Sequence, residues 1–190
     1  MKIALITGAS QGIGSAIAQE LNQKKIKVIL IARSKVKLKK IQTSLKFPKN
    51  SIIISKDLRS LSACNSIGAK IKKLNYLINV AGATKGGSFL KLKDNVWDDG
   101  FNLKFKAAVR LSRNFWKTLR RNKGKVINIG GWAARNPSHT FMIGGAVNSA
   151  LNNFSRALAM QGKIDKVSVS IIHPGMTLTS KLKKLLETDS

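Results

Sequence analysis

The sequence predicts an α/β fold in which helices cover both faces of a parallel, doubly wound sheet. Short apolar runs rich in β-branched residues alternate with helical patterns along the chain. Strands that are apolar throughout are buried on both faces, which is typical of parallel sheets. A length of 190 residues suffices for one sizeable core. We therefore expect one three-layer domain over residues 1–190, with about six strands.

The first strand, Ile3–Ile6, leads into a glycine-rich turn at residues 7–14, and a helix follows. Glycines there permit a tight turn, close approach of a ligand to the backbone, and tight packing of the helix on the strand. Amide N–H groups at a helix N-terminus favour phosphate. This order predicts a nucleotide site. A tight turn without a ligand is the alternative.

The remaining elements follow the same alternation. Further strands are expected at Val28–Ile31, Ile52–Ile54, Tyr76–Ile78, Val126–Ile129 and Val167–Ile172. Further helices are expected at Ser34–Leu45, Leu61–Leu74, Phe101–Leu119 and Ile143–Leu158. The last two carry wide apolar stripes, which predict either burial against the sheet or a dimer interface.

The chain is strongly basic, with 35 Lys and Arg against 8 Asp and Glu and a net charge of +27. Such a field attracts nucleic acid, anionic membranes or phosphorylated substrates. The lysines are spread over most segments and are not interleaved with aromatic residues, so we favour solvated surface lysines and do not favour nucleic-acid binding. The single Cys64, the lack of a leader and the lack of a long apolar stretch predict a cytoplasmic protein without a membrane partner.

The second strand ends in Ala32-Arg33-Ser34. Dinucleotide folds that select NAD usually place Asp or Glu here, whereas a guanidinium and a hydroxyl suit a 2′-phosphate. This favours NADP(H) over NAD(H). The alternative is that Arg33 is an ordinary surface cation.

Over residues 1 to about 182 the sequence resembles the short-chain dehydrogenase/reductase family, which has a Rossmann fold. The resemblance is carried by the glycine-rich turn, by Asp57-Leu58, by the segment Asn79–Gly82 and by the segment Pro174–Thr179. Together with the end of the second strand, it implies the following cofactor-binding residues: Gly8, Ser10, Gln11, Gly12, Ile13, Gly14, Arg33, Ser34, Asp57, Leu58, Asn79, Ala81, Gly82, Asn148, Pro174, Gly175, Thr177 and Thr179. We assign no metal ligands.

The family's catalytic side chains are a Ser, a Tyr and a Lys. Aligning this chain on the family pattern places Gly131 at the Ser, Gly144 at the Tyr and Asn148 at the Lys. Reducing a carbonyl needs a group that stabilises and then protonates the developing alkoxide, and a glycine offers neither. Asn102 falls where relatives carry an active-site Asn, and His139 is the remaining candidate acid. The alternative for Asn102 is that its side chain only forms a hydrogen bond within its own helix. The alternative for His139 is that it is an ordinary surface residue.

Two functions stay open. The first is an NADP(H)-dependent oxidoreductase acting on a small carbonyl or alcohol, and the second is a catalytically silent dinucleotide-binding protein that works through a partner. A third hypothesis, a basic nucleic-acid-binding protein, is supported only by the net charge. The family commonly continues past Thr179 with a substrate-covering helix pair and a seventh strand, so we expect a reduced lid. The resemblance also implies a homodimer through the helices Phe101–Leu119 and Ile143–Leu158.

Overall fold

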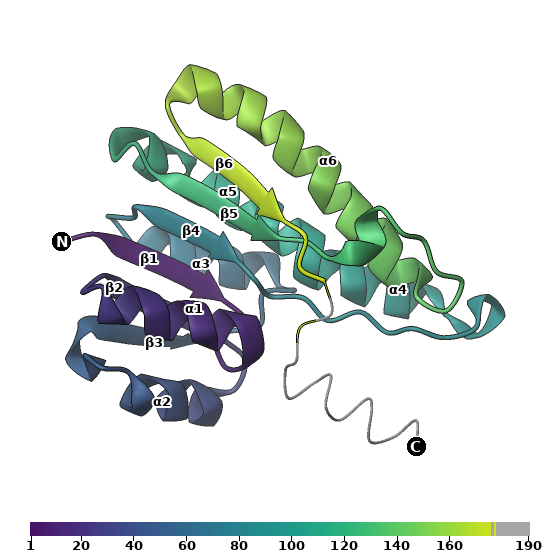
Figure 1. The fold of residues 1–190 in the computed structure, drawn as a ribbon, viewed down its shortest axis with the longest axis horizontal. Helices are drawn as coiled ribbons and strands as arrows, with labels where there is room; N and C mark the ends of the chain where they lie inside the picture. Colours follow the sequence, from purple (N-terminus) through teal and green to yellow (C-terminus); the bar gives the residue numbers. More distant parts are fainter. Residues whose placement is uncertain (176, 178–190) are drawn as a thin grey trace.

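The computed structural model describes residues 1–175 and 177. Its centre is a six-stranded parallel sheet with the strand order β3-β2-β1-β4-β5-β6 (Figure 1). The strands are β1 (Ile3–Thr7), β2 (Lys27–Ala32), β3 (Ser51–Ser55), β4 (Tyr76–Asn79), β5 (Lys125–Ile129) and β6 (Ser168–Ile172). The strand order reverses direction between β1 and β4. A cleft for a ligand is expected at the carboxyl ends of these two strands.

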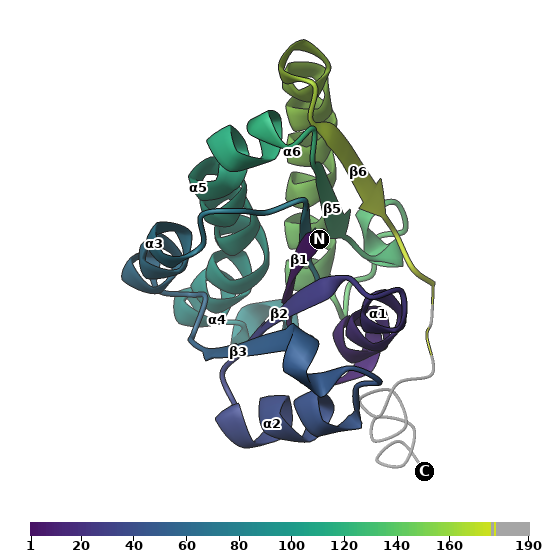
Figure 2. The same cartoon turned by 90° about the vertical axis from the view of Figure 1, so that its left-hand side faces the viewer.

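Helices cover the two faces of the sheet unequally (Figure 2). The helices are α1 (Gly12–Gln23), α2 (Lys35–Ser44), α3 (Leu61–Lys70), α4 (Asp94–Gly100), α5 (Ala107–Arg121) and α6 (Met142–Asp165). Helices α1 and α2 lie on one face, and α3, α5 and α6 lie on the other. Short 3₁₀ turns are η1 (Pro48–Asn50), η2 (Phe89–Lys91) and η4 (Trp132–Ala134). The predicted doubly wound fold is confirmed.

The core divides into two clusters, one on each face of the sheet. On the α3–α5 face, Leu111, Phe115 and Leu119 are fully buried against the sheet. On the α1–α2 face, Ala18 and Leu38 are fully buried against β1 and β2. Burial of a large apolar side chain contributes about 1.5–3 kcal/mol. The apolar stripe of α5 is therefore used within the chain.

Three predicted helix boundaries were wrong. The helix expected over Ile143–Leu158 continues as α6 to Asp165, and it ends where Lys166 takes up a left-handed conformation. The helix expected over Leu61–Leu74 ends at Lys70, because the chain must leave it to bury Leu74 completely just before β4. A further turn would also set Lys70 and Lys73 at i,i+3, where like charges repel.

The helix expected from Phe101 begins earlier, at Asp94, whose carboxylate lies in the first turn of α4 and favours the helix N-terminus. Between α4 and α5 the chain forms a π-helical segment, η3 (Phe101–Lys106), in which the amide of Ala107 donates to the carbonyl of Asn102. The wider turn changes which side chains face the end of the sheet. Hydrophobic periodicity at 3.6 residues per turn does not reveal such a segment.

Candidate functional site

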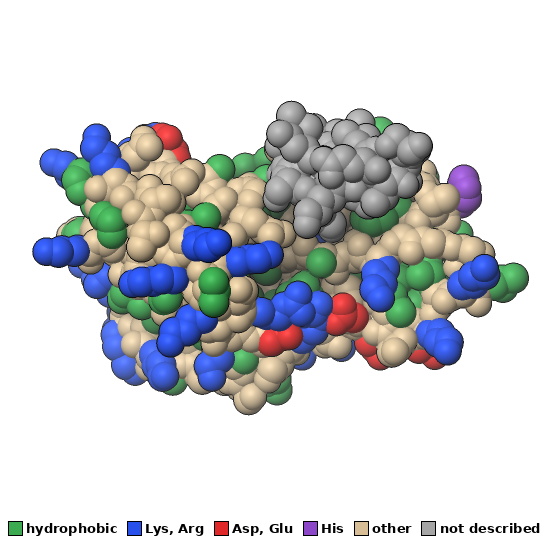
Figure 3. All heavy atoms as spheres, turned by 90° about the horizontal axis from the view of Figure 1, so that it is seen from below, with side chains coloured by type: hydrophobic (Ala, Val, Ile, Leu, Met, Phe, Trp, Pro, Cys, Tyr) green, Lys and Arg blue, Asp and Glu red, His purple; other side chains and the backbone are tan. Residues whose placement is uncertain are grey.

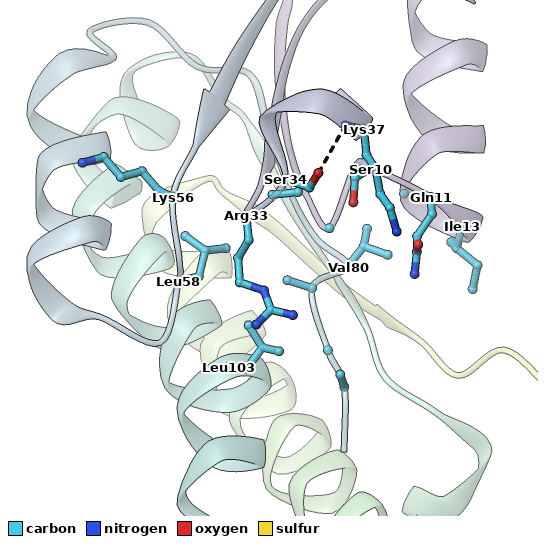
Figure 4. A pocket seen from close by; sticks show the side chains of 17 residues that line it. Ser10, Gln11, Ile13, Arg33, Ser34, Lys37, Lys56, Leu58, Val80 and Leu103 are labelled. Atoms are coloured by element: carbon cyan, nitrogen blue, oxygen red, sulfur yellow. Dashed lines mark hydrogen bonds between the residues drawn. The ribbon is translucent and has the colours of Figure 1, made fainter. Parts of the chain in front are cut away.

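A cleft of about 360 Å³ opens at the carboxyl ends of β1, β2 and β4, where the strand order reverses (Figure 4). Its walls come from the glycine-rich turn, the end of β2, the segment after β3, the segment after β4 and η3. The lining residues are Gly8, Ser10, Gln11, Gly12, Ile13, Gly14, Ala32, Arg33, Ser34, Lys37, Lys56, Leu58, Val80, Ala81, Gly82, Ala83 and Leu103. This is the position at which doubly wound sheets bind nucleotides.

The glycine-rich turn needs its glycines for steric reasons. Gly8 has a φ of +65° and Gly12 a φ of +55°, a region that glycine enters without strain. A Cβ on Gly14 would lie 2.8 Å from the carbonyl carbon of Gly8, so only glycine allows α1 to pack this closely on the turn. Gln11, at the start of α1, makes no side-chain cap hydrogen bond. The cap therefore leaves the first amides of α1 available, and because Gly12, Ile13 and Gly14 line the cleft, this helix terminus suits an anion bound there.

The turn is tied to the opposite wall of the cleft through Thr7. Its buried hydroxyl accepts hydrogen bonds from the amides of Val80 and Ala81, at 2.9 and 3.0 Å. A Cβ on Gly8 would lie only 3.0 Å from Ala81. These contacts fix the width of the cleft between β1 and β4.

The end of the cleft at β2 is cationic. Arg33 extends from the end of β2 between Leu58 and Leu103, while Lys37 extends from α2 toward Ser10 and Gln11 (Figure 4). Ser34 is the N-cap of α2, and its hydroxyl accepts from the amide of Lys37 at 3.3 Å. A capping hydroxyl still has a proton to donate, so this end offers a guanidinium, an ammonium and an O–H to an anion.

An ion-pair network lies beside this cationic end. The guanidinium of Arg59 donates to both carboxylate oxygens of Asp99 on α4 and to Asp57, with an Nη1–Oδ1 distance of 3.2 Å to Asp57. The hydrogen bond from Arg59 is the main cause that holds the pKa of Asp99 below its ordinary value, and the charges of Arg59, Arg33 and Lys85 add to it. This network fastens the segment after β3 to α4. It occupies Asp57, which does not line the cleft.

Beyond the β4 end of the cleft lie the three positions aligned with the family's catalytic side chains. A Cβ on Gly131 would lie 2.7 Å from Nδ2 of Asn148, so this amide occupies the space beside Gly131. A Cβ on Gly144 would overlap the edge of the Phe141 ring, closest to its Cε1. Asn148 is 5% exposed, and its Oδ1 is buried without a hydrogen-bond partner in the described structure. A buried acceptor of this kind is rare and needs an explanation.

The candidate catalytic residues Asn102 and His139 do not line the cleft. Asn102 lies in η3, where its carbonyl accepts the π-type hydrogen bond from Ala107. His139 is exposed in the loop between η4 and α6. His173 lies after β6, where its ring contacts the backbone of Gly131 and the side chain of Asn152.

Of the predicted cofactor-binding residues, eleven line the cleft: Gly8, Ser10, Gln11, Gly12, Ile13, Gly14, Arg33, Ser34, Leu58, Ala81 and Gly82. Six others are described but lie outside this lining: Asp57, Asn79, Asn148, Pro174, Gly175 and Thr177. Thr179 lies outside the described residues. The side chain of Asn79 is turned into the sheet, where it donates to Asn128.

Sequence reasoning missed several lining residues, of which Lys37 and Lys56 are charged. Lys37 follows the N-cap Ser34 by three residues, so helix phase could have placed it on the side of the cleft. Elsewhere, cations are dispersed over the face seen in Figure 3 and not gathered into one patch. Within residues 1–175 and 177, no helix is long and apolar enough to cross a membrane. The same residues contain no group of three or more His, Cys, Asp and Glu side chains suited to a metal ion.

A nicotinamide dinucleotide fits this donor set on structural grounds. Only glycines leave room along the turn, the cationic end suits a phosphate, and the buried Oδ1 of Asn148 suits a ligand hydroxyl.

The chain is similar to several known proteins. A 3-oxoacyl-[acyl-carrier-protein] reductase of Rickettsia typhi is 32% identical over 189 residues, which cover 98% of the chain and 77% of the relative. The structure of L-sorbose reductase from Gluconobacter frateurii, complexed with NADPH and L-sorbose, has a TM-score of 0.90 and 28% identity, and covers 100% of the chain and 76% of that structure. A metagenomic short-chain oxidoreductase in complex with NADP has a TM-score of 0.86 and 29% identity, and covers 93% and 82%. The family described as short chain dehydrogenase matches residues 2–190, and the chain therefore belongs to this family.

Proposed function

We propose that the protein is an NADP(H)-dependent oxidoreductase that acts on a small carbonyl or alcohol. The observation that carries the proposal is the cleft, in which the glycine-rich turn lies next to an end formed by Arg33, Ser34 and Lys37. Similar proteins support the proposal of an NADP(H)-dependent oxidoreductase. One is named as a 3-oxoacyl-[acyl-carrier-protein] reductase, and two others have structures with NADPH or NADP. We attribute the NADP(H) preference to Arg33 and Lys37, whose positive charges attract a 2′-phosphate. Folds that select NAD carry an Asp or Glu at the end of this strand, and its carboxylate would repel the phosphate.

In this proposal each part of the cleft has a separate task. Arg33, Ser34 and Lys37 hold the 2′-phosphate, Leu58 and Leu103 form the apolar floor under the adenine, and the amides of the turn hold the diphosphate. The residues Ala81 and Gly82 line the path to β5. The bound nicotinamide supplies the hydride. The chain supplies binding, orientation and electrostatics.

The proton donor is the part of the proposal that the family pattern leaves open. With Gly131 and Gly144 at two catalytic positions, we assign the donor to His139 or to a bound water, and we place Asn102 beside the site. His139 is a candidate because an imidazole is a common general acid in enzymes. Its exposed loop would have to close over the substrate.

A catalytically silent dinucleotide-binding protein is the second candidate. The observation that favours it is the ring of Phe141, which fills the space where a side chain on Gly144 would stand. Such a protein keeps the cofactor cleft and has no group to protonate an alkoxide. A screen of NADPH oxidation over a panel of ketones, aldehydes and keto esters separates the two. Turnover supports the oxidoreductase, and cofactor binding without turnover on any substrate supports the silent protein.

Assembly as a homodimer through α5 and α6 stays a prediction. The buried residues of α5 face the sheet, and its exposed face carries Arg113, Lys117 and Arg121, which would repel a second copy. On α6, Met160 and Ile164 are 71% and 76% exposed and lie one turn apart. We propose that α6 provides the apolar contact, and light scattering at low and high salt tests whether a dimer forms.

A further inference from the structure

Lys104, on η3, lies beyond the β4 end of the cleft. Its aliphatic chain crosses Gly82, since a Cβ on Gly82 would lie 2.8 Å from Cδ of Lys104. Its ammonium group then donates to the carbonyl oxygen of Gly130 at 2.8 Å. Gly82 lines the cleft, and Gly130 follows β5, the strand next to β4 on the side away from β2. The ammonium group thus lies past the end of the cleft that is opposite Arg33.

Asn148 provides a second, independent observation at the same place. Its amide lies against Gly131, the residue after Gly130, and its Oδ1 is buried without a hydrogen-bond partner in the part of the chain that the structure describes. Buried acceptors are rarely left unpaired, because the loss of hydration is costly. The Oδ1 of Asn79 and the hydroxyl of Ser112 are also buried without a partner, but Asn148 is the one of the three that lies beside Gly131. A ligand that reaches Gly131 could supply a donor to this oxygen.

The two groups are complementary to a diol. An ammonium group only donates hydrogen bonds, and an amide oxygen only accepts them. A vicinal diol does both, because each hydroxyl has a proton and lone pairs. One hydroxyl oxygen can accept from Lys104 while the neighbouring hydroxyl donates to Asn148.

The direction in which a dinucleotide would run along the cleft indicates which of its diols reaches these two residues. A dinucleotide with its 2′-phosphate at Arg33 and its diphosphate at the N-terminus of α1 continues past Gly82 toward β5. Its second ribose, on the nicotinamide side, then reaches Lys104 and Asn148. We propose that Lys104, together with Asn148, binds the hydroxyls of this second ribose, an inference that rests on the proposed function.

A purely structural role for Lys104 is the rival explanation, because its hydrogen bond to Gly130 also satisfies a carbonyl at a strand end. The two roles differ in which ligand they affect. NADPH contains the second ribose, whereas adenosine 2′,5′-bisphosphate contains only the phosphorylated adenosine half. Loss of a ribose contact weakens the binding of NADPH and leaves the binding of the bisphosphate unchanged. Damage to the fold weakens both ligands.

The experiment is calorimetric titration of the full chain with NADPH and with adenosine 2′,5′-bisphosphate. We expect Lys104→Met to weaken NADPH about tenfold or more, as for loss of a charged hydrogen bond, and to leave the bisphosphate affinity unchanged. Lys106→Met, an exposed lysine of the same segment, is the control and should alter neither affinity. Asn148→Ala should also weaken NADPH selectively. If Lys104→Met does not fold, Lys104→Gln provides the same comparison, because it keeps a donor for Gly130 and removes the charge.

Each result has a distinct meaning. Unchanged NADPH affinity in a folded Lys104 variant, or equal losses for both ligands, overturns the role of Lys104 and leaves the proposed function standing. Wild-type binding of the bisphosphate without binding of NADPH also overturns the inference. If the wild type binds neither ligand, the proposed function fails and the inference fails with it.

Discussion

The side-chain amide of Asn79 donates a 2.8 Å hydrogen bond to Oδ1 of Asn128, and so links the ends of β4 and β5 beneath the cleft. Asn128 in turn donates to the hydroxyl of Ser155 on α6 at 2.8 Å, and that hydroxyl donates to the carbonyl of Leu151. All three polar side chains are buried. This chain of hydrogen bonds fixes α6, the helix that also carries Asn148, to the sheet.

Removing the middle of this network should destabilise the protein. Asn128→Ala leaves the buried groups of Asn79 and Ser155 without their partner, which we expect to lower the free energy of unfolding by about 2–3 kcal/mol. Urea unfolding followed by circular dichroism measures the change. Asn153→Ala, at an exposed position of α6, is the matched control and should stay within about 0.5 kcal/mol of wild type. An equally small effect for Asn128→Ala would contradict the importance of the network.

The steric account of the turn predicts opposite effects for the same substitution at two helix positions. Gly14→Ala places a Cβ against the carbonyl group of Gly8. We expect it to lower the free energy of unfolding by about 1–3 kcal/mol and to remove most of the cofactor affinity. Gly145→Ala meets nothing closer than the carbonyl oxygen of Ala133 at 3.4 Å and should be neutral, or stabilising by up to about 1 kcal/mol. Thermal unfolding and NADPH titration of both variants test this. If Gly14→Ala kept the wild-type stability and NADPH affinity, the backbone of the turn would have to move aside for the added Cβ, and the steric account would be contradicted.

Phe141 determines how the catalytic side chains can be restored. Gly131→Ser, Gly144→Tyr and Asn148→Lys together should leave the activity at the wild-type level, because the new Tyr collides with the ring of Phe141. Adding Phe141→Ala removes the ring, and we expect a gain of about 10²–10⁴-fold, the usual contribution of a general acid. NADPH oxidation on one ketone panel compares wild type, the triple variant, the quadruple variant and His139→Ala. A gain in the triple variant alone would refute the obstruction by Phe141, and loss of wild-type turnover in His139→Ala would assign the acid to His139.

The ion pair between Arg59 and Asp99 predicts a specific dependence of stability on acid. Because the pKa of Asp99 is below its ordinary value of 3.8, its carboxylate stabilises the fold above that pH, and this contribution is lost as the pH falls through the lower folded value. Asp99→Asn should therefore be less stable than wild type at pH 7, by at most about 1 kcal/mol because the pair is partly exposed to solvent. The difference should close below pH 3.8.

Unfolding free energies measured from pH 7 to pH 2 check this prediction. Asp98→Asn, at the exposed neighbouring position, should follow the wild-type curve throughout. A constant gap between Asp99→Asn and wild type over the whole range would show that the carboxylate charge is not what stabilises the pair.

The order of strands and helices could be predicted from the sequence because the central strands β1, β2 and β4 are apolar over most of their length. The glycine-rich turn and the residue Arg33 were also predictable, because backbone geometry and phosphate charge restrict which residues suit those positions. Eleven of the predicted cofactor-binding residues line the cleft, of which Leu58, Ala81 and Gly82 were predicted from the family resemblance.

The remaining site residues depend on side-chain directions that a linear pattern does not contain. Asn79 follows a strand at the edge of the cleft, yet its side chain is turned into the sheet toward Asn128. Lys104 reaches Gly130 from a π-helical segment, which changes the phase of the helix. Phe141 fills the space beside Gly144, and only the packed loop before α6 shows this.

Titration of the wild-type protein with NADPH and with NADH by calorimetry tests the central claim most directly. The account predicts that NADPH binds at least about tenfold more tightly, and that Arg33→Asp removes about 2 kcal/mol from NADPH binding by deleting a charge-assisted bond and adding repulsion. Arg113→Asp, on the exposed face of α5, controls for the change in net charge and should leave the preference intact. Equal affinity for the two cofactors that Arg33→Asp does not alter would contradict the role of Arg33, and the absence of binding to either would contradict the proposed function.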